Sequence, residues 1–342
     1  MAKRILVIRF SALGDVAMTV PVIHAVLEQH PDLEMVVLTR PAFRELFGNH
    51  PRLQVVGADL KGKHKGFAGL YRLFREMNRN HSVDAVADLH RVLRTSILRF
   101  FFFWKFIPIS VIDKGRKEKK ALTRRENKAF RQLPTSFERY AAVFQKLGYP
   151  VQLKNEPLTG KPNREEMVYK VGVAPFAQHA GKMYPAEKME HVLELLHQYP
   201  DIQLMMFGGG KKELDQMNEW KSRFPRIEIV AGKYGLGEEI NIMKGIDVML
   251  SMDSANMHLA SLAETPVVSV WGATHPYAGF YGWRQQPENA VQVNLFCRPC
   301  SVFGNKPCYR GDLACMHSIA PETIVKQVLK TIRYGNGESR EN

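Results

Sequence analysis

The sequence predicts an α/β protein with two domains, each built on a parallel β-sheet that helices cover on both faces. Short runs of valine, isoleucine and leucine alternate with helical patterns almost throughout the chain, which is typical of strands buried in a parallel sheet. A stretch of low periodicity at residues 155–166 interrupts the alternation, which then starts again. The chain has 342 residues, which fits two typical domains better than one.

The first half, residues 1–155, is the predicted N-terminal domain. Its strands are apolar runs, and its last helix stops at Gly148 and Pro150, which favour a helix end. The expected strands are 5–9, 33–39, 53–56, 83–88 and 107–112, and the expected helices are 15–29, 41–48, 67–80, 92–104 and 136–147.

The second half, residues 156–320, is the predicted C-terminal domain, and 155–166 contains the linker. The expected strands are 170–174, 202–207, 227–230, 246–251 and 267–271, and the expected helices are 186–198, 211–223, 238–244 and 254–263. A last helix at 321–334 starts with proline, has an apolar stripe, and could pack back toward the N-terminal domain. The polar tail 335–342 is expected to fray.

The most informative motif is Asp253-Ser254-Ala255, which lies between an apolar run and a helical pattern. Small residues at such a turn let a ligand approach the backbone, and the free N–H groups of the helix start favour a phosphate. His258 falls in the first helical turn. A similar strand-turn-helix unit begins the chain, so we expect two domains that face one another across a nucleotide site.

The turn at residues 9–15 ends in Asp15, at a predicted helix start. Aspartate at this place is most often an N-cap, and from the turn alone we favour that role. The turn also lies at the sheet edge where ligands bind in open α/β folds, and a carboxylate there could accept a proton from a sugar hydroxyl. With one glycine, Gly14, the turn matches a dinucleotide fingerprint poorly.

Three further turns of the second half carry candidate donor-binding residues. Lys182 is a point charge suited to a diphosphate. Gly208 and Gly209 permit close approach of a ligand or simply form a tight turn. Glu239, or its neighbour Glu238, could bind ribose hydroxyls or cap a helix.

These motifs together resemble the ADP-heptose:lipopolysaccharide heptosyltransferases, glycosyltransferase family 9. The matching segments are 9–21, 182–185, 207–210, 253–260 and 271–274, in the same order along nearly the whole chain. The resemblance implies the GT-B fold, two Rossmann-like domains with parallel sheets facing across a cleft. The acceptor would bind the N-terminal domain and the nucleotide sugar the C-terminal domain.

The resemblance also assigns roles to single residues. The catalytic base falls on Asp15, and the acceptor-binding residues are Ser11, Gly14, Arg91 and Arg94. The donor-binding residues are Lys182, Gly208, Gly209, Glu239, Asp253, Ser254, Ala255 and His258. The sequence departs from the family at Tyr184, where tryptophan is usual, and at 177–179, which are often rich in threonine.

The implied activity is inverting transfer of a heptose, or a related sugar, from an ADP-sugar such as ADP-heptose to a lipopolysaccharide core or similar glycolipid. No cofactor is required for this chemistry. Two alternatives stay open: a GT-B-like sugar-nucleotide epimerase or hydrolase, and a basic nucleic-acid-binding protein. The second lacks a recognised binding motif, so we expect no nucleic-acid partner.

The net charge of +14 favours an anionic partner, here an anionic glycolipid acceptor. Residues 113–131 hold nine basic and three acidic side chains, and we expect them on the acceptor face of the N-terminal domain. Before them, 100–104 read Phe-Phe-Phe-Phe-Trp. Such aromatic bulk beside basic charge could contact a membrane surface, but a buried helix packed on a sheet is the favoured interpretation.

The chain contains no run of 18 apolar residues and no recognisable secretory signal. We therefore expect a cytoplasmic protein, with peripheral contact at the inner face of the cytoplasmic membrane as a further option.

Four cysteines, Cys297, Cys300, Cys308 and Cys315, have one metal-like spacing, that of the first two. A structural zinc site, four reduced thiols or a disulfide are all compatible with the sequence, and zinc is the less favoured because only one tight pair supports it.

Overall fold

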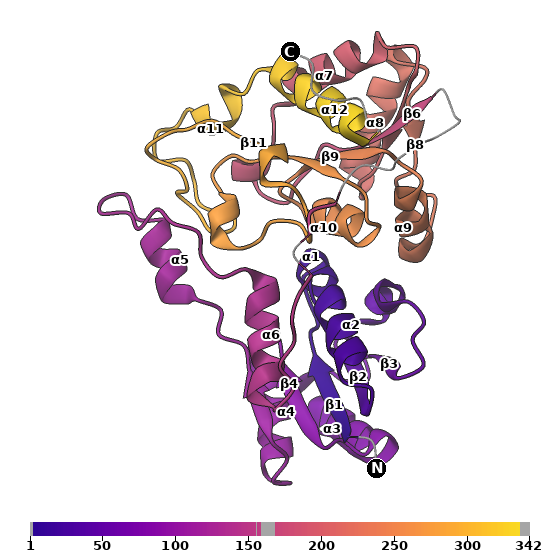
Figure 1. The fold of residues 1–342 in the computed structure, drawn as a ribbon, viewed down its shortest axis with the longest axis vertical. Coiled ribbons are helices and arrows are strands. Elements are labelled where there is room, and N and C mark those ends of the chain that lie inside the picture. Colours follow the sequence, from indigo (N-terminus) through magenta and orange to yellow (C-terminus); the bar gives the residue numbers. More distant parts are fainter. Residues whose placement is uncertain (1–2, 155, 159–167, 336–342) are drawn as a thin grey trace. The chain divides into compact units, whose positions relative to one another are not determined.

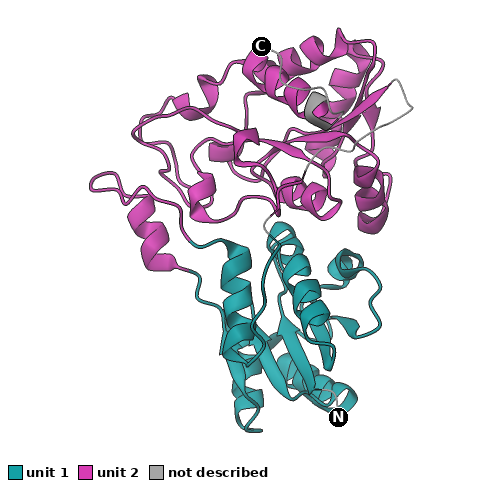
Figure 2. Ribbon diagram, in the orientation of Figure 1, with its two compact units in different colours: residues 1–114, 134–154 teal, residues 115–133, 155–342 magenta. Residues whose placement is uncertain are grey.

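The computed structural model describes residues 3–154, 156–158 and 168–335. The chain divides into two compact units (Figure 2), residues 1–114 with 134–154 and residues 115–133 with 155–342. Both units are α/β structures with one all-parallel sheet, as the alternation of apolar runs and helices predicts.

The first unit holds a five-stranded sheet in the order β3-β2-β1-β4-β5 (Figure 1). Its strands are β1 (Lys3–Ile8), β2 (Leu33–Thr39), β3 (Leu53–Gly57), β4 (Ala85–Asp88) and β5 (Ile109–Val111). Its helices are α1 (Leu13–Ala17), α2 (Val20–Gln29), η1 (Pro41–Phe47), α3 (Gly66–His81), α4 (Leu93–Phe103) and α6 (Ser136–Lys146). The predicted helix 15–29 is thus two helices, since α1 ends at Ala17 and α2 begins at Val20 with Pro21 in its first turn.

One face of this sheet packs on α3 and α4. Leu6 and Ile8 of β1 share a buried cluster with Leu73 of α3 and with Leu98 and Phe102 of α4. The predicted burial of the aromatic run is correct for Phe102 only, because a helix that lies on a sheet buries one stripe and leaves the others in solvent. Phe100, Phe103 and Trp104 are exposed.

The second unit holds a six-stranded sheet in the order β11-β10-β9-β6-β7-β8. Its strands are β6 (Tyr169–Ala174), β7 (Ile202–Met206), β8 (Glu228–Ile229), β9 (Val248–Met252), β10 (Val267–Val270) and β11 (Ala290–Val291). Its helices are α5 (Arg116–Leu122), η2 (Ala180–Lys182), α7 (Ala186–His197), α8 (Lys211–Arg223), α9 (Leu236–Lys244), α10 (Ala255–Leu262), η3 (Pro276–Ala278), η4 (Pro287–Asn289), α11 (Ala314–His317) and α12 (Pro321–Gly335).

The basic segment 115–133 belongs to the second unit, although the sequence places it in the domain 1–155. Leu122 and Leu133 share a buried cluster with Ala278, and the Leu133 N–H donates a 2.9 Å hydrogen bond to the Tyr277 carbonyl. The prediction that this segment lies on the N-terminal domain is therefore wrong. Leu122 and Leu133 bury this otherwise charged segment against the second unit. Their packing partners cannot be identified from the sequence.

Helix α12 packs within the second unit. Ile324, Val328 and Ile332, the predicted apolar stripe, are buried in the core that β9, β10 and α7 also form. Packing of this helix toward the N-terminal domain stays a prediction. Of the predicted linker, residue 155 and residues 159–166 lie outside the described residues, as do residues 336–342 of the tail.

Among the described residues, no helix is both long and apolar enough to cross a membrane.

Candidate active site

In the first unit, the carboxyl ends of β1 and β4 lie side by side, with Ile8 paired to Asp88. The strand order reverses between these two strands, since β2 and β3 lie on one side and β5 on the other. Ligands of open α/β sheets bind at such a switch point. The predicted residues Ser11, Gly14 and Asp15 follow β1 there, and Arg91 and Arg94 follow β4.

Asp15 is both a helix cap and a partly accessible carboxylate. Its Oδ2 accepts a 3.3 Å hydrogen bond from the Ala12 N–H at the start of α1 and lies 2.5 Å from the Arg9 guanidinium. The Asp15 side chain is 34% exposed, whereas that of Arg9 is 6% exposed. Arg9 also donates to the Leu89 carbonyl at 2.6 Å. A buried, anchored arginine thus orients a carboxylate that solvent still reaches.

His90 is a neighbour of this turn that the sequence analysis does not single out. Its Nε2 lies 3.4 Å from the Ser11 hydroxyl oxygen. Burial, followed by the positive charges of Arg9 and Lys114, lowers the pKa of His90 to about 3. The imidazole is therefore neutral at neutral pH and can exchange hydrogen bonds with Ser11 or a ligand hydroxyl without bringing in charge.

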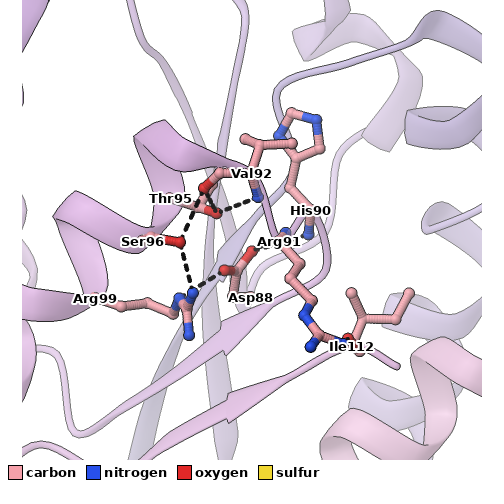
Figure 3. A network of polar contacts seen from close by, with 8 residues as sticks. All are labelled: Asp88, His90, Arg91, Val92, Thr95, Ser96, Arg99 and Ile112. Carbon is pink, nitrogen blue, oxygen red and sulfur yellow. Dashed lines mark hydrogen bonds and ion pairs between the residues drawn. The ribbon is translucent and has the colours of Figure 1, made fainter. Parts of the chain in front are cut away.

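Asp88 organises the turn between β4 and α4 (Figure 3). Its Oδ1 accepts hydrogen bonds from the backbone N–H groups of His90 at 2.9 Å and Arg91 at 2.8 Å. Its Oδ2 lies 2.9 Å from Nε of Arg99. Two hydrogen bonds to Oδ1 and one ion pair to Oδ2 thus hold the buried carboxylate, which fixes the backbone from which His90 and Arg91 point in opposite directions (Figure 3).

The two predicted acceptor arginines lie on either side of the start of α4. Arg91 has a left-handed backbone with φ of 49°, and its side chain donates to the Ile112 carbonyl at 3.3 Å. Its guanidinium also lies 4.0 Å from the Asp113 carboxylate. Arg94 is exposed in the first turn of the helix. Both arginines are exposed, and Arg91 in addition contacts the end of β5 through Ile112 and Asp113.

In the second unit the switch point lies between β6 and β9, where Ala174 pairs with Ser251. Lys182 follows β6 and Asp253 follows β9, and the structure joins them in an ion pair of 2.9 Å. The Asp253 Oδ2 also accepts a 2.8 Å hydrogen bond from Thr274. The Asp253 side chain is 5% exposed and that of Lys182 is 17% exposed. The lysine ammonium thus sits where a ligand of this sheet would bind, held by a buried carboxylate.

The loop around Gly304 closes over the stem of Lys182. Gly304 has φ of 73°, and a Cβ at this position would lie 2.6 Å from Cγ of Lys182. Any larger residue there would displace the lysine, so the ammonium position depends on this glycine.

Helix α10 begins directly after Asp253 and presents an uncapped start. Ser254 is its N-cap residue, but its side chain makes no capping hydrogen bond and no acidic residue lies in the first turn. The Ser254 hydroxyl lies 3.3 Å from that of Ser251 instead. Ala255 adds no bulk, and His258 is buried in the same helix. The first N–H groups of α10 therefore remain for an anion beside Lys182.

Some of the remaining predicted donor-binding residues are used for contacts within the protein, and one of them can still contact a ligand. The Gly209 N–H already donates to Glu213 at 2.9 Å, and Gly208 packs near Phe176 and Met217. Glu238 caps α9 by accepting from the Gly235 N–H at 3.3 Å. Glu239 makes no such cap, and burial raises the pKa of its carboxyl. Glu239 is therefore the member of the pair that stays available for hydroxyl groups.

Arg298 is a buried residue of this unit that the sequence analysis misses. It donates to the carbonyls of Gly272 at 2.5 Å and Thr274 at 3.0 Å, and to Gln292 at 2.9 Å. Burial lowers its pKa to about 10, so it stays charged at neutral pH. Arg298 thus braces the turn that supplies Thr274 to Asp253. No spacing or composition signal marks it in the sequence.

Tyr184, the departure from the family pattern, is a core residue. It is 2% exposed, and its hydroxyl donates to the Ile319 carbonyl at 2.8 Å. Its ring is buried in the core of the second unit, and its hydroxyl satisfies a buried carbonyl.

The four cysteines line one small cavity together with Arg298 and Asp312, and all four are free thiols. Burial raises the pKa of Cys300 and raises that of Cys315 to about 11, which favours the protonated form. Throughout 3–154, 156–158 and 168–335, no group of three or more His, Cys, Asp or Glu side chains is arranged to hold a metal ion.

Comparisons with known proteins agree with this geometry. A sequence model described as glycosyltransferase family 9 (heptosyltransferase) matches residues 70–306. Lipopolysaccharide heptosyltransferase 1 of Campylobacter coli is 26% identical over 355 residues, covering 95% of this chain and 98% of the relative.

Solved structures with the GT-B fold match both units of the chain. The glycosyl transferase family 9 protein from Veillonella parvula has a TM-score of 0.72 at 19% identity, covering 97% of this chain and 98% of its own. The E. coli heptosyltransferase WaaC, solved with ADP, has a TM-score of 0.69 at 17% identity, covering 96% and 99%. The predicted GT-B fold is confirmed.

Proposed function

Because the chain belongs to glycosyltransferase family 9, the heptosyltransferases, we propose that it transfers a heptose from ADP-heptose to the lipopolysaccharide core or a similar bacterial glycolipid. The single observation that carries this proposal is the Lys182–Asp253 pair of 2.9 Å beside the uncapped start of α10. That arrangement suits a diphosphate at the switch point of the sheet.

The donor side of the proposal rests on the second unit. Lys182 and the first N–H groups of α10 bind the diphosphate, with Ser254 and Ala255 leaving room for it and His258 supporting the helix start. Glu239 binds the ribose hydroxyls, and Gly208 and Gly209 let the nucleotide approach the backbone. The E. coli heptosyltransferase WaaC was solved with ADP, which supports ADP as the nucleotide here.

The proposed reaction is a direct displacement. An acceptor hydroxyl oxygen attacks the anomeric carbon of the heptose, and the bond from that carbon to the diphosphate oxygen breaks. Asp15 takes the hydroxyl proton as general base, while ADP leaves with the bonding electron pair. Lys182 and the α10 N–H groups stabilise the negative charge that develops on the diphosphate. Attack opposite the leaving group inverts the anomeric centre.

Arg9 supports this role of Asp15. A carboxylate paired at 2.5 Å with a buried guanidinium is held in one orientation, and orientation is what a general base needs to meet a hydroxyl proton. Ser11 and Gly14 shape the same turn, and Arg91 and Arg94 supply positive charge for an anionic acceptor at the neighbouring strand end.

These residues supply the catalytic charge of the proposed displacement without a cofactor. For the four cysteines we propose reduced thiols, since all four are free and burial raises the pKa of Cys300 and Cys315. Elemental analysis of protein purified without a metal-affinity step tests this, and one zinc per chain would overturn it.

The experiment that tests transfer measures ADP release from ADP-heptose with and without a lipid A–Kdo acceptor. We expect release that depends on the acceptor and a product heavier by one heptose. Release of free sugar at the same rate without acceptor would favour the epimerase or hydrolase alternative. Family membership already argues against a nucleic-acid-binding protein.

The place of action follows from the acceptor. A lipopolysaccharide precursor is anchored in a bilayer by its acyl chains, so we propose a cytoplasmic enzyme that works at the inner face of the cytoplasmic membrane.

A further inference from the structure

Helices α3 and α4 of the first unit expose a row of large apolar side chains, here called the aromatic ridge. The exposed fractions reach 62% for Phe67, 68% for Phe103, 67% for Trp104 and 96% for Phe106. Tyr71 and Phe100 complete the ridge and are also exposed. Single exposed apolar residues are common on proteins, but a gathering of six on two adjacent helices marks an interaction site.

Ring contacts show that most of the ridge is continuous. Phe101 lies 5.3 Å, centroid to centroid, from Phe67 and from Tyr71, and 5.9 Å from Phe100. Phe100 in turn lies 5.9 Å from Trp104. Four exposed rings, those of Phe67, Tyr71, Phe100 and Trp104, therefore form one surface around the half-buried Phe101, and Phe103 and Phe106 follow on the same chain segment.

The ridge is anchored to the core of the first unit. Phe101 contacts Phe74 at 5.5 Å, and Phe74 contacts the fully buried Phe102 at 4.9 Å. An exposed ring that rests on a packed ring loses little conformational freedom when it binds, which favours association.

The end of α4 holds its aromatic residues on an ordered turn. The Phe106 N–H donates to the Phe103 carbonyl at 2.9 Å, and the Lys105 N–H donates to the Phe102 carbonyl at 3.0 Å. Phe106 itself has φ of 56°, a left-handed conformation that closes the turn. The two largest exposed fractions on the ridge thus belong to residues of a hydrogen-bonded turn.

Positive charge borders the ridge. Tyr71 lies in a surface hollow that Arg72, Arg75, Arg79 and Lys105 also line, and these four cations are exposed. The only acidic side chain of this hollow, Glu76, pairs with Lys63 at 2.7 Å and with His64 at 3.1 Å. The hollow therefore presents a net positive charge next to apolar rings.

From this combination we propose that the aromatic ridge docks the enzyme on the surface of an anionic phospholipid bilayer. Aromatic side chains partition into the headgroup boundary, and adjacent arginine and lysine attract anionic headgroups. A second copy of the chain is a poorer occupant, because a two-fold contact would bring the cations of both ridges together. The inference rests on the proposed function only for its purpose, which is to hold the enzyme at a membrane-bound acceptor.

The test is co-sedimentation of the full chain with vesicles at low salt. We expect binding to phosphatidylglycerol vesicles, weak binding to phosphatidylcholine vesicles, and a decrease with salt, since surface attraction is screened. The variant Phe103→Ser/Trp104→Ser/Phe106→Asn should bind phosphatidylglycerol vesicles at least about tenfold more weakly. Thermal melting checks that the variant is folded, which we expect because all three side chains are exposed.

The matched control is Phe296→Ser/Phe303→Ser, which removes two exposed aromatic rings of the second unit, 78% and 54% exposed. It should bind vesicles as the unaltered chain does. A second variant, Arg75→Gln/Arg79→Gln/Lys105→Gln, should lose most of the salt-sensitive part of binding. The proposal would be overturned if the unaltered chain did not bind vesicles, or if the ridge variant bound them as well as the unaltered chain. It would also be overturned if the control variant lost as much binding as the ridge variant. Concentration-dependent dimers that only the ridge variant abolishes, without vesicle binding, would assign the ridge to a second copy.

A transfer assay separates this inference from the proposed function. The ridge variant should keep full turnover on a delipidated, water-soluble acceptor and lose turnover on acceptor embedded in vesicles. If no heptose is transferred to either acceptor while vesicle binding still depends on the ridge, the proposed function fails and the docking surface stands.

Discussion

Asp15 combines two roles that sequence reasoning treats as alternatives. It caps the start of α1 through the Ala12 N–H and also presents a carboxylate that is 34% exposed beside Arg9. The capping role does not consume the carboxylate, because Oδ2 accepts one long hydrogen bond of 3.3 Å. The general-base role is therefore compatible with the cap.

Replacing Asp15 by Asn separates the two roles. The amide oxygen can still accept from Ala12, but it cannot take a proton at neutral pH. We expect transfer to fall by a factor on the order of 100 or more, with ADP affinity unchanged and melting temperature shifted by only a few degrees. Single-turnover rates and calorimetry with ADP measure this. Activity within a few-fold of the unaltered enzyme, with a lowered melting temperature, would leave Asp15 as a cap only.

Lys182 is expected to bind the diphosphate. Lys182→Met keeps the apolar stem under Gly304 but removes the charge that faces Asp253 and the ligand. We expect ADP affinity to fall on the order of tenfold, ~1.4 kcal/mol, and turnover to fall further, because the charge also stabilises the leaving group. Calorimetry with ADP provides the affinity. The control is Lys233→Met, which removes an exposed lysine of the same unit and should bind ADP normally. Equal ADP affinities of the two variants would show that Lys182 does not bind the diphosphate.

Arg94 is the residue through which the proposed acceptor site on the first unit can be tested. Arg94→Ala should raise the Michaelis constant for an anionic acceptor several-fold and reduce its dependence on salt, while ADP affinity stays the same. Arg44→Ala removes an exposed arginine of η1 and serves as the control. If Arg94→Ala weakens donor binding alone, the acceptor does not use this strand end.

The residues that the sequence analysis finds and misses have a common physical explanation. Asp15, Lys182 and Asp253 follow strands of strong apolar pattern, so their place at a sheet edge is predictable. Arg9, His90 and Arg298 act through burial and long-range contacts, such as the 2.5 Å pair of Arg9 with Asp15. Neither burial nor such partners can be read from spacing along the chain.

Among the elements, the segment 115–133 stands out. It lies in the sequence between β5 and α6 of the first unit, but it packs with the second unit. Lys128 holds its place there by donating to the carbonyls of Phe296 at 3.2 Å, Arg298 at 2.8 Å and Pro299 at 3.1 Å. These carbonyls flank Cys297, and burial lowers the pKa of Lys128. A single ammonium thus fixes the backbone of the cysteine loop.

Lys128→Met should loosen that loop. We expect faster reaction of Cys297 and Cys300 with a thiol reagent, by several-fold, because backbone carbonyls lose their shared donor. The melting temperature should fall as well. Lys120→Met, at an exposed lysine of α5, should leave both unchanged. Identical thiol reaction rates for the two variants would show that Lys128 does not order the loop.

Elements with a strong apolar pattern are predictable, and short or weakly patterned ones are not. The strands of both sheet centres and the long helices lie within a few residues of their predicted bounds. The two-residue strand β11 and the helices α5 and α11 are missed, because they bury too little to leave a pattern. The aromatic run at 100–104 is difficult for a different reason. Consecutive phenylalanines have no polar–apolar periodicity, so the sequence does not indicate which face of α4 is buried.

For the whole molecule, two buried histidines make stability depend on pH. Burial lowers the pKa of His90 to about 3 and, with Arg298, that of His275 to about 4. The unfolded chain takes up these protons near pH 6.5 and the folded chain does not. Their neutral forms therefore favour the folded state above about pH 6.5, and this stability is lost as pH falls toward 4 and 3, by up to about 1.4 kcal/mol per pH unit for each histidine.

Melting temperatures between pH 8 and pH 4 test this. His275→Gln should melt lower at pH 8, where the imidazole packs well, but its melting temperature should fall less steeply below pH 6.5 than that of the unaltered chain. His191→Gln removes a partly exposed histidine of α7 whose pKa is raised by its hydrogen bond to Glu194, so this variant should not flatten the slope. Parallel slopes for the unaltered chain and His275→Gln would show that His275 is not held neutral by burial.

We propose above all that this chain transfers heptose by direct displacement. The most direct measurement is the anomeric configuration of the new linkage, determined by NMR on product made from ADP-heptose and a delipidated acceptor. Direct displacement predicts a single heptose added with the configuration opposite to that in the donor, and formation of this product on the order of 100-fold more slowly with Asp15→Asn. A product that retains the donor configuration, or free heptose with no glycan product, would contradict it.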